Sequence, residues 1–284
     1  MKNKLFILSI FLLTSCLPIA RIVKYIPAQR ISKIEFSNNQ EIEYPFYYSN
    51  SDEPYFKTLQ KEINNLDFNL EKNDLRKVEM ITNWSNKQWE HSGNNQPTKP
   101  DAVTILQEAK RGKKFRCVEY GILNASLLNY YGLKARVIGL KAKDVEVVKY
   151  AGGHVASEVF LPSLKKWIFA DAQFNIIPYL NNVPLNAVEL QHAIFYNKEN
   201  LKLKSNGTDI SESEKKNYIK FISKYLYFFD INFDNRVSTD VKRTYNGHQK
   251  LMLVPINVTP PRKFQRSQIL DIEITNSNSA FYPK

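Results

Sequence analysis

The sequence predicts an α+β fold in which helices pack on an antiparallel sheet. Two observations lead to this class. The chain contains a run of helical patterns followed by a run of strand patterns, which is typical of α+β proteins. In addition, two predicted strands, residues 155–161 and 167–170, are separated by the short turn Pro-Ser-Leu-Lys-Lys. Two strands joined in this way predict an antiparallel hairpin.

Three helices are predicted in the first part of the chain. Residues 59–66 have weak helical periodicity. Residues 74–90 have a stronger pattern with Asp74 as N-cap, and Asp101 is expected to cap a short helix that ends near Ala109. The apolar positions of the second helix recur at every third residue: Leu75, Val78, Ile81 and Trp84.

A fourth helix is predicted to begin at Cys117, directly after the basic turn of residues 111–116. Gly132 is a suitable stop, because glycine readily adopts the left-handed conformation that follows many helices. One face of this helix is apolar: Tyr120, Leu123, Leu127 and Leu128. The sulfur of Cys117 is therefore expected in the first turn of a helix.

The strands are predicted from β-branched and apolar runs. These runs are residues 31–36, 135–140, 145–148, 155–161, 167–170, 250–256 and 269–274. Residues 181–188 are expected to be irregular. A late helix is predicted to begin at Ser211, and its buried face is expected to include Tyr218, Ile222 and Tyr225.

Residues 1–15 are predicted to be a signal peptide. A basic head precedes the apolar stretch of residues 5–13, which is too short for a membrane-spanning helix of roughly 20 residues. The stretch ends in Leu-Thr-Ser-Cys, which resembles a lipobox. This resemblance implies that Cys16 carries lipid and anchors the protein in the cell envelope, at the outer membrane or the periplasmic face of a double-membraned cell. An ordinary signal peptide or a chance cysteine are the alternatives.

The net charge of +12 predicts attraction to anionic lipid or polysaccharide. The basic residues are scattered, and no RNA-binding or zinc-finger spacing is present, so no nucleic-acid partner is expected. Two cysteines and four scattered histidines provide no ligand pair at a useful spacing, so neither a metal nor another cofactor is predicted.

Apart from Cys16, Cys117 is the only cysteine, and an unpaired cysteine in an exported chain indicates a reactive thiol. The alternative is a buried structural cysteine. A helix N-terminus favours the thiolate, which is the attacking form. Four basic residues just upstream are expected to act in the same direction: Arg111, Lys113, Lys114 and Arg116.

A base and an orienting group are predicted at the hairpin. His154 follows Gly152-Gly153 and opens one strand, and Asp171 closes the partner strand. The start of one hairpin strand lies beside the end of the other, so the two side chains are expected within hydrogen-bond reach. An imidazole oriented by a carboxylate is the usual partner of a thiol nucleophile.

Four segments resemble the transglutaminase-like superfamily, which includes papain-like thiol enzymes such as peptide N-glycanases and bacterial transglutaminase-like proteases. They are Arg-Cys-Val-Glu-Tyr at 116–120, Tyr-Gly-Leu-Lys-Ala-Arg-Val-Ile-Gly at 131–139, and Gly-His-Val-Ala-Ser-Glu-Val-Phe at 153–160 with Trp-Ile-Phe-Ala-Asp at 167–171. The resemblance covers about residues 75–180. It implies that Cys117 is the nucleophile, His154 the general base and acid, and Asp171 the orienter.

The chain is expected to divide into a lipidated extension (16–53), a transglutaminase-like catalytic core (54–200) and a C-terminal helix and strands (201–284) that complete or extend the core. Two departures bear on substrate choice. Ala-Ser stands at 156–157, where family members often have an aromatic residue, and Ala-Gln stands at 172–173, where many have Pro-Thr.

An oxyanion donor is also expected. The backbone N–H of Cys117 is one candidate, and Trp89 or Gln88 is the second, although packing or solvation would equally explain these side chains. Glu119 is expected to be a solvated carboxylate of the first helical turn. Ordinary surface or core positions are expected for three histidines: His91, His192 and His248.

The predicted activity is attack on an amide by Cys117 with formation of a thioester. Water would then make the protein a peptidase or amidase, and an amine would make it a cross-linking transglutaminase. The expected partners are a protein or peptide substrate in the envelope and the membrane itself. A catalytically inactive binding lipoprotein and a structural protein that holds anionic polymer are the alternatives.

Overall fold

The computed structural model describes residues 33–39, 42–64, 66–237, 239 and 241–284. The predicted signal peptide and Cys16, which is predicted to carry lipid, lie outside these residues. No helix of the described ranges has the length and apolar character needed to cross a membrane.

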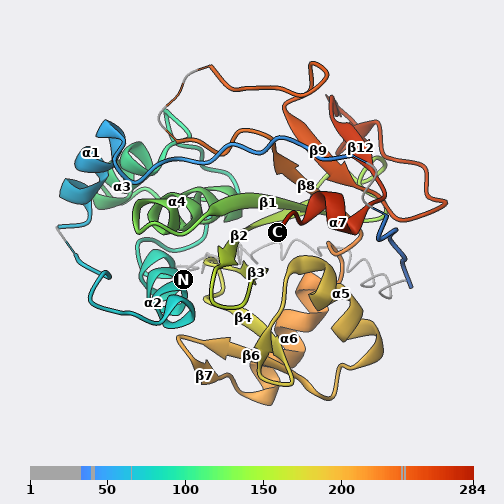
Figure 1. Ribbon diagram of the computed structural model, residues 1–284, viewed down its shortest axis with the longest axis horizontal. Helices are drawn as coiled ribbons and strands as arrows, with labels where there is room; N and C mark the ends of the chain where they lie inside the picture. The colour runs from blue at the N-terminus through green and yellow to red at the C-terminus, as the bar shows by residue number, and fades with distance from the viewer. Residues whose placement is uncertain (1–32, 40–41, 65, 238, 240) are drawn as a thin grey trace, which may run out of the picture.

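Four helices precede the main sheet (Figure 1). They are α1 (Pro54–Glu62), α2 (Asp74–Asn86), α3 (Ala102–Lys110) and α4 (Cys117–Tyr130). The predicted start of α4 is confirmed, and Gly132 has the left-handed φ of +80° that ends it. Asp101 caps α3 as predicted. The cap of α2 is Asn73 rather than Asp74, and this helix ends at Asn86, short of the predicted residue 90.

The main sheet has six strands in the order β12-β9-β8-β1-β2-β3. Their bounds are β1 (Ala135–Lys141), β2 (Gly153–Leu161), β3 (Lys166–Ala170), β8 (Phe228–Asn232), β9 (Lys250–Leu253) and β12 (Glu273–Thr275). All neighbours are antiparallel except β12 and β9. Helix α4 packs closely on β2. The approach is so close that a Cβ at Gly121 would stand only 2.9 Å from the Ala156 carbonyl oxygen. The predicted α+β class, with its helix on an antiparallel sheet, is confirmed.

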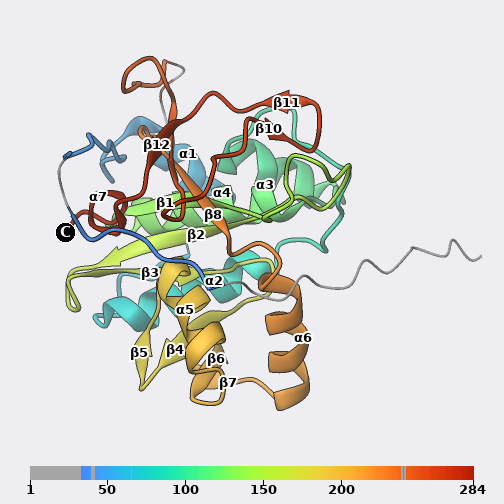
Figure 2. The same cartoon turned by 90° about the vertical axis from the view of Figure 1, so that its right-hand side faces the viewer.

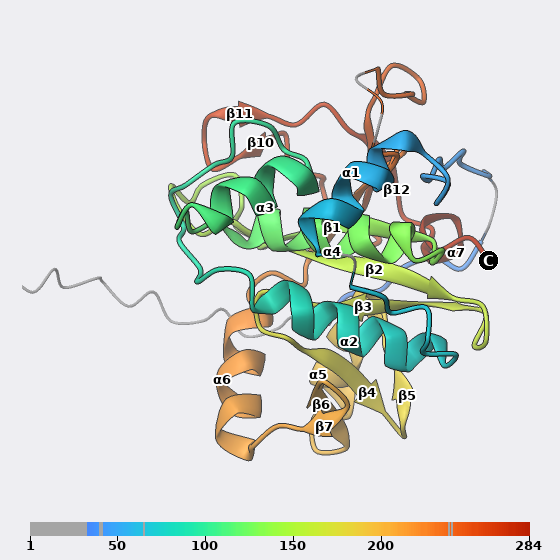
Figure 3. The ribbon, with the colours of Figure 1, turned by 90° about the vertical axis from the view of Figure 1, so that its left-hand side faces the viewer.

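A second layer lies on the other side of the main sheet from α1, α3 and α4 (Figures 2 and 3). It holds helices α5 (Ala187–Tyr196) and α6 (Glu212–Ile222) and a small sheet of β5 (Val183–Pro184), β4 (Ile177–Leu180), β6 (Leu201–Ser205) and β7 (Thr208–Asp209). A hairpin of β10 (Lys263–Phe264) and β11 (Gln268–Ile269) and the short helix α7 (Asn278–Phe281) complete the described elements.

Some predicted elements are wrong. Residues 145–148 form turns instead of a strand, because Val145 is buried under residues near the β10–β11 hairpin while its neighbours remain outside. Residues 33–36 contain no strand. The irregular segment predicted at 181–188 holds β5 and the start of α5, which Asn186 caps. The late helix begins after Ser211 as predicted, but it ends at Ile222.

Candidate active site

His154 and Asp171 are hydrogen-bonded through Nε2 and Oδ2 at 2.8 Å. His154 is the second residue of β2, and Asp171 directly follows β3. The pairing of Ser157 with Ala170 places the start of one strand beside the end of the other. Both side chains are almost fully buried. The sequence prediction that hairpin geometry brings these two groups together agrees with this contact.

The carboxylate of Asp171 is held by three further donors. The backbone N–H groups of Gln173 and Phe174 donate to Oδ1 at 3.1 and 3.4 Å. The hydroxyl of Tyr218, from α6, donates to Oδ2 at 2.9 Å. Burial and then the negative charge of Asp171 raise the pKa of Tyr218 well above 10, so this hydroxyl remains a donor. The carboxylate therefore has little freedom to rotate away from His154.

Cys117 is the first residue of α4, and its side chain interacts with the His154 ring. Burial by itself would lower the pKa of His154. The charge of Asp171, its hydrogen bond and the interaction with Cys117 outweigh burial and raise this pKa from 6.5 to about 10. The imidazole therefore carries its proton at neutral pH, between a carboxylate on one side and a sulfur at a helix N-terminus on the other.

Aromatic rings surround the imidazole. The His154 ring lies 5.1 Å from Phe221, 6.0 Å from Phe174 and 6.1 Å from Tyr225, measured between ring centroids. Burial and then the charge of Cys117 raise the pKa of Tyr225. Such a shell excludes water, and electrostatic interactions are stronger where water is excluded.

Most of the basic residues upstream of Cys117 are already paired. Lys113 contacts Glu108 at 2.6 Å, Lys114 contacts Glu90, and Arg116 contacts Glu119 at 2.6 Å. The prediction that Glu119 is solvated is wrong: its carboxylate is buried and accepts from the Arg116 backbone N–H at 3.0 Å. Apart from His154, the local influence on the sulfur is therefore the helix N-terminus rather than a free basic patch.

His91 is a site residue that the sequence analysis missed. It bridges to Phe115, two residues before Cys117, and the Ser92 N–H donates to the Phe115 carbonyl at 2.7 Å. Burial and then the positive charge of His154 lower the pKa of His91, while Asp171 opposes them. The two imidazoles are thus close enough to interact. Nothing in the local sequence of His91 indicates this proximity.

The other two histidines have surface contacts. His192 stacks on Tyr196 with centroids 4.5 Å apart, and Nδ1 of His248 contacts Asp271 at 2.6 Å. The expectation of ordinary positions holds for these two. Within the described ranges, no three His, Cys, Asp or Glu side chains are grouped so as to hold a metal ion.

The two side chains considered as oxyanion donors differ. Nε2 of Gln88 donates to the Trp84 carbonyl at 2.7 Å. The ring of Trp89 lies 4.5 Å from Tyr120 and 5.4 Å from Phe115. Its buried indole N–H has no hydrogen-bond partner among the described residues. An unpartnered buried donor costs free energy, so Trp89 is the stronger candidate of the two.

The comparisons with known proteins concern mainly this region. Residues 64–172 match the Transglutaminase-like superfamily, over less than half of the chain. A solved structure from Cytophaga hutchinsonii, described as a "Putative Cysteine Protease", is 20% identical with a TM-score of 0.33. The match covers 50% of this chain and 46% of that one, so this chain spans about half the length of that protein. Comparison with curated proteins gives no match.

Helix α6, which supplies Tyr218 and Phe221, lies outside the matched residues. The three proposed catalytic residues lie within them: the match begins ahead of α2 and ends just after Asp171, and it includes Cys117 and His154. Residues 64–172 of this chain therefore form a transglutaminase-like superfamily domain.

Proposed function

We propose that the protein is a thiol enzyme that acts on amide bonds, with Cys117 as nucleophile, His154 as general acid and base, and Asp171 as the group that orients His154. One observation carries the proposal: Nε2 of His154 is hydrogen-bonded to Asp171 at 2.8 Å, and the same ring interacts with the side chain of Cys117, the first residue of α4. Thiol enzymes need this combination of nucleophile, base and orienter. The superfamily match of the surrounding residues supports it.

The chemistry follows from these positions. The thiolate of Cys117 attacks the amide carbonyl carbon, and the negative charge moves to the carbonyl oxygen. When the C–N bond breaks, His154 gives its proton to the departing amine, and a thioester remains on Cys117. His154, now neutral, takes a proton from the incoming water or amine, which releases the acyl group and restores the thiolate and the protonated ring.

The developing oxyanion needs donors that are already in position. The backbone N–H of Cys117 is one, since the first N–H groups of a helix have no partner within it. The indole N–H of Trp89 is the second candidate because it is unpartnered. A small movement of the ring toward the substrate would be required, because the nitrogen is buried in the absence of substrate.

The setting that we propose is the cell envelope, with a lipid anchor on Cys16 as the lipobox-like segment implies. A net charge of +12 supports attraction to the anionic polymers and lipids found there. Metabolic labelling with a fatty-acid probe tests the anchor. Label that is lost in Cys16→Ala supports it, and equal labelling of both proteins contradicts it.

The decisive experiment combines thiol labelling and mass spectrometry. We expect iodoacetamide to label Cys117 much faster than free cysteine at pH 6, and His154→Ala to abolish the difference. Envelope peptides incubated with the protein should then show cleavage, a gain of about 1 Da for deamidation, or a loss of about 17 Da for cross-linking. His192→Ala is the matched control, because this histidine lies away from the site. Slow labelling together with unchanged peptides would favour the inactive binding lipoprotein.

A further inference from the structure

A cavity of about 800 Å³ lies along the C-terminal half of α4. Ala125, Ser126 and Asn129 line it. These residues are eight to twelve positions after Cys117, which is roughly 12–18 Å along a helix that rises 1.5 Å per residue. The cavity is within the size range of small-molecule sites, roughly 300–1,000 Å³. It is distinct from the proposed catalytic site.

The cavity exists because two neighbouring strands separate. β1 and β8 are paired from Leu140 to Ile138, and the last pair is Ile138 with Ile231. β1 continues to Ala135, whereas the chain after Asn232 turns toward the N-terminal segment, where the Asn235 N–H donates to the Tyr47 carbonyl at 2.8 Å. The space between the diverging strands is the cavity.

A side chain satisfies the backbone that the departing strand leaves unpaired. Nδ2 of Asn129 donates to the Ala135 carbonyl at 3.0 Å, and Oδ1 accepts from the Ala135 N–H at 3.2 Å. A buried backbone group without a partner would destabilise the fold. Because Asn129 supplies both bonds, the space can stay open without that cost.

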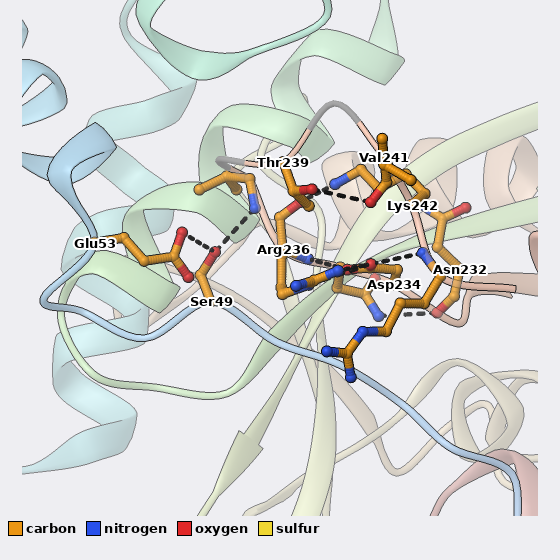
Figure 4. Close-up of polar contacts among 11 residues, drawn as sticks. Ser49, Glu53, Asn232, Asp234, Arg236, Thr239, Val241 and Lys242 are labelled. Carbon is orange, nitrogen blue, oxygen red and sulfur yellow. Dashed lines mark hydrogen bonds and ion pairs between the residues drawn. The ribbon is translucent and has the colours of Figure 1, made fainter.

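The outer wall is fixed by polar contacts (Figure 4). The Val237 N–H donates to Ser49 Oγ at 2.9 Å, and Ser49 in turn donates to Glu53 at 3.3 Å. Asp234 accepts from the backbone N–H groups of Arg236 and Arg243 at 3.0 and 2.9 Å. These contacts join the wall to the N-terminal segment, so the cavity does not depend on one loop.

The carboxylates at the cavity are already saturated. Asp101 accepts from the N–H and hydroxyl of Thr104 at 3.0 and 2.8 Å. Asp234 holds Arg236 through Nε at 2.9 Å and Nη2 at 2.5 Å. Burial would raise the pKa of Asp234, but the hydrogen bonds from Arg236 and from backbone N–H groups lower it to about 2. Neither carboxylate has much capacity left to bind a cation.

Positively charged donors remain available at the rim. Lys99 is exposed and forms no ion pair in the part of the chain that the structure describes. Arg236 uses Nε and Nη2 for Asp234, and its Nη1 makes no hydrogen bond to another described residue. Both side chains line the cavity, and ammonium and guanidinium groups bind carboxylates through charge-assisted hydrogen bonds.

The inner lining is apolar. Four residues that line the cavity lie at the margin of the hydrophobic core and are only partly buried: Val103, Ile122, Val137 and Val237. They belong to α3, α4, β1 and the wall after β8. An apolar surface beside a cationic edge is complementary to a molecule with an apolar body and one anionic end.

We propose that this cavity binds a small amphipathic carboxylate, with the carboxylate at Lys99 and Arg236 and the apolar body on the valine and isoleucine lining. The end of a short apolar peptide and a fatty acid share this chemistry. The proposal goes beyond the enzymatic function and does not require it.

The test is isothermal titration calorimetry of the full-length protein with matched acid and amide probes. One pair is N-acetyl-Leu-Leu and its carboxamide, and the other is octanoate and octanamide. We expect at least one acid to bind with one site per chain, and its amide to bind at least tenfold more weakly. The acid that binds shows whether the ligand is the end of an apolar peptide or a fatty acid. Equal binding of acid and amide, or no binding of either acid at millimolar concentration, would overturn the proposal.

Variants locate the site. Lys99→Gln should weaken the binding acid about tenfold, and Arg236→Gln by a similar factor, whereas Lys198→Gln on a distant surface should leave binding unchanged. Because Arg236→Gln removes an ion pair from the wall, the melting curve of this variant must be measured as well. If Arg236→Gln unfolds, Lys99→Gln alone decides the test. Blocking Cys117 with iodoacetamide should not alter binding. Loss of binding in the blocked protein would instead assign the ligand to the catalytic site.

Discussion

The two ends of α4 use charge in opposite ways. At the Cys117 end, His154 and Asp171 are buried and bonded to each other, and the acceptors of Asp171 are filled by protein donors. At the other end, the carboxylates are filled in the same manner, but the exposed Lys99 forms no ion pair within the described residues. Charged groups that are bonded to each other, as at Cys117, favour chemistry at a fixed sulfur. A charged group without an ion-pair partner, as at Lys99, favours binding of a ligand.

The largest expected effect concerns the sulfur. Cys117→Ser should lower the rate of amide conversion at least about 10³-fold, because a hydroxyl is a much weaker nucleophile near neutral pH. The same variant should bind the amphipathic carboxylate as the wild-type protein does. Product formation and calorimetry on one protein preparation measure both. If the variant loses binding as well as activity, the catalytic site and the cavity are not independent sites.

The pH dependence of stability tests the buried ion pair of His154 and Asp171. The folded-state pKa of His154 is raised from 6.5 to about 10. The protonated ring therefore stabilises the fold fully below pH 6.5, and this contribution is lost as the pH rises through about 10. We expect the free energy of unfolding to fall by about 3–5 kcal/mol between pH 6 and pH 10, from about 1.4 kcal/mol per pKa unit.

Urea denaturation across this pH range measures the change. In His154→Gln this part of the pH dependence should be absent. Both proteins should also be compared in a common Cys117→Ala background, in which titration of the thiol does not contribute. Because Cys117 is one of the causes that raise the pKa of His154, the fall in this background should be smaller than in the wild type. Parallel pH profiles of the two proteins would show that the imidazole is not protonated in the folded state.

Tyr218 tests whether α6 contributes to the site. Tyr218→Phe removes the hydroxyl that donates to Asp171, and the more concentrated negative charge on Asp171 should raise the pKa of His154 further. We expect about a tenfold loss in kcat and a shift of the alkaline limb of the pH profile to higher pH. Tyr245→Phe is a matched control on another part of the fold. A loss of stability with an unmoved pH profile would indicate a purely structural hydroxyl.

His91 should give the smallest effect. Its lowered pKa keeps it neutral at pH 8, where His91→Gln should change kcat/KM less than about threefold. As the pH falls, a protonated His91 would lower the pKa of His154, but with that pKa at about 10 the ring of His154 stays charged at pH 5. The pH profiles of the variant and the wild type should therefore coincide on the acid side. An acid limb that moves in the variant would contradict this small role of His91.

The sequence alone predicted the parts of the site that depend on neighbours in the chain. The start of α4 at Cys117 follows from the pattern of residues 117–132. The contact between His154 and Asp171 follows from a hairpin whose predicted turn has only five residues. The resemblance to the transglutaminase-like superfamily rested on these same segments and agrees with the match of residues 64–172. Local geometry of this kind is encoded by periodicity and turn residues.

The pairings between distant segments were decided only by the tertiary structure. Tyr218 reaches Asp171 across 47 positions, and His91 pairs with Phe115 without any local pattern that marks it. The cavity forms because β8 leaves β1, and Asn129 bonds the backbone of Ala135 that is left unpaired. Such contacts depend on how whole elements pack, and packing is set by the shape and burial of many side chains together, which periodicity along one strand or helix does not specify.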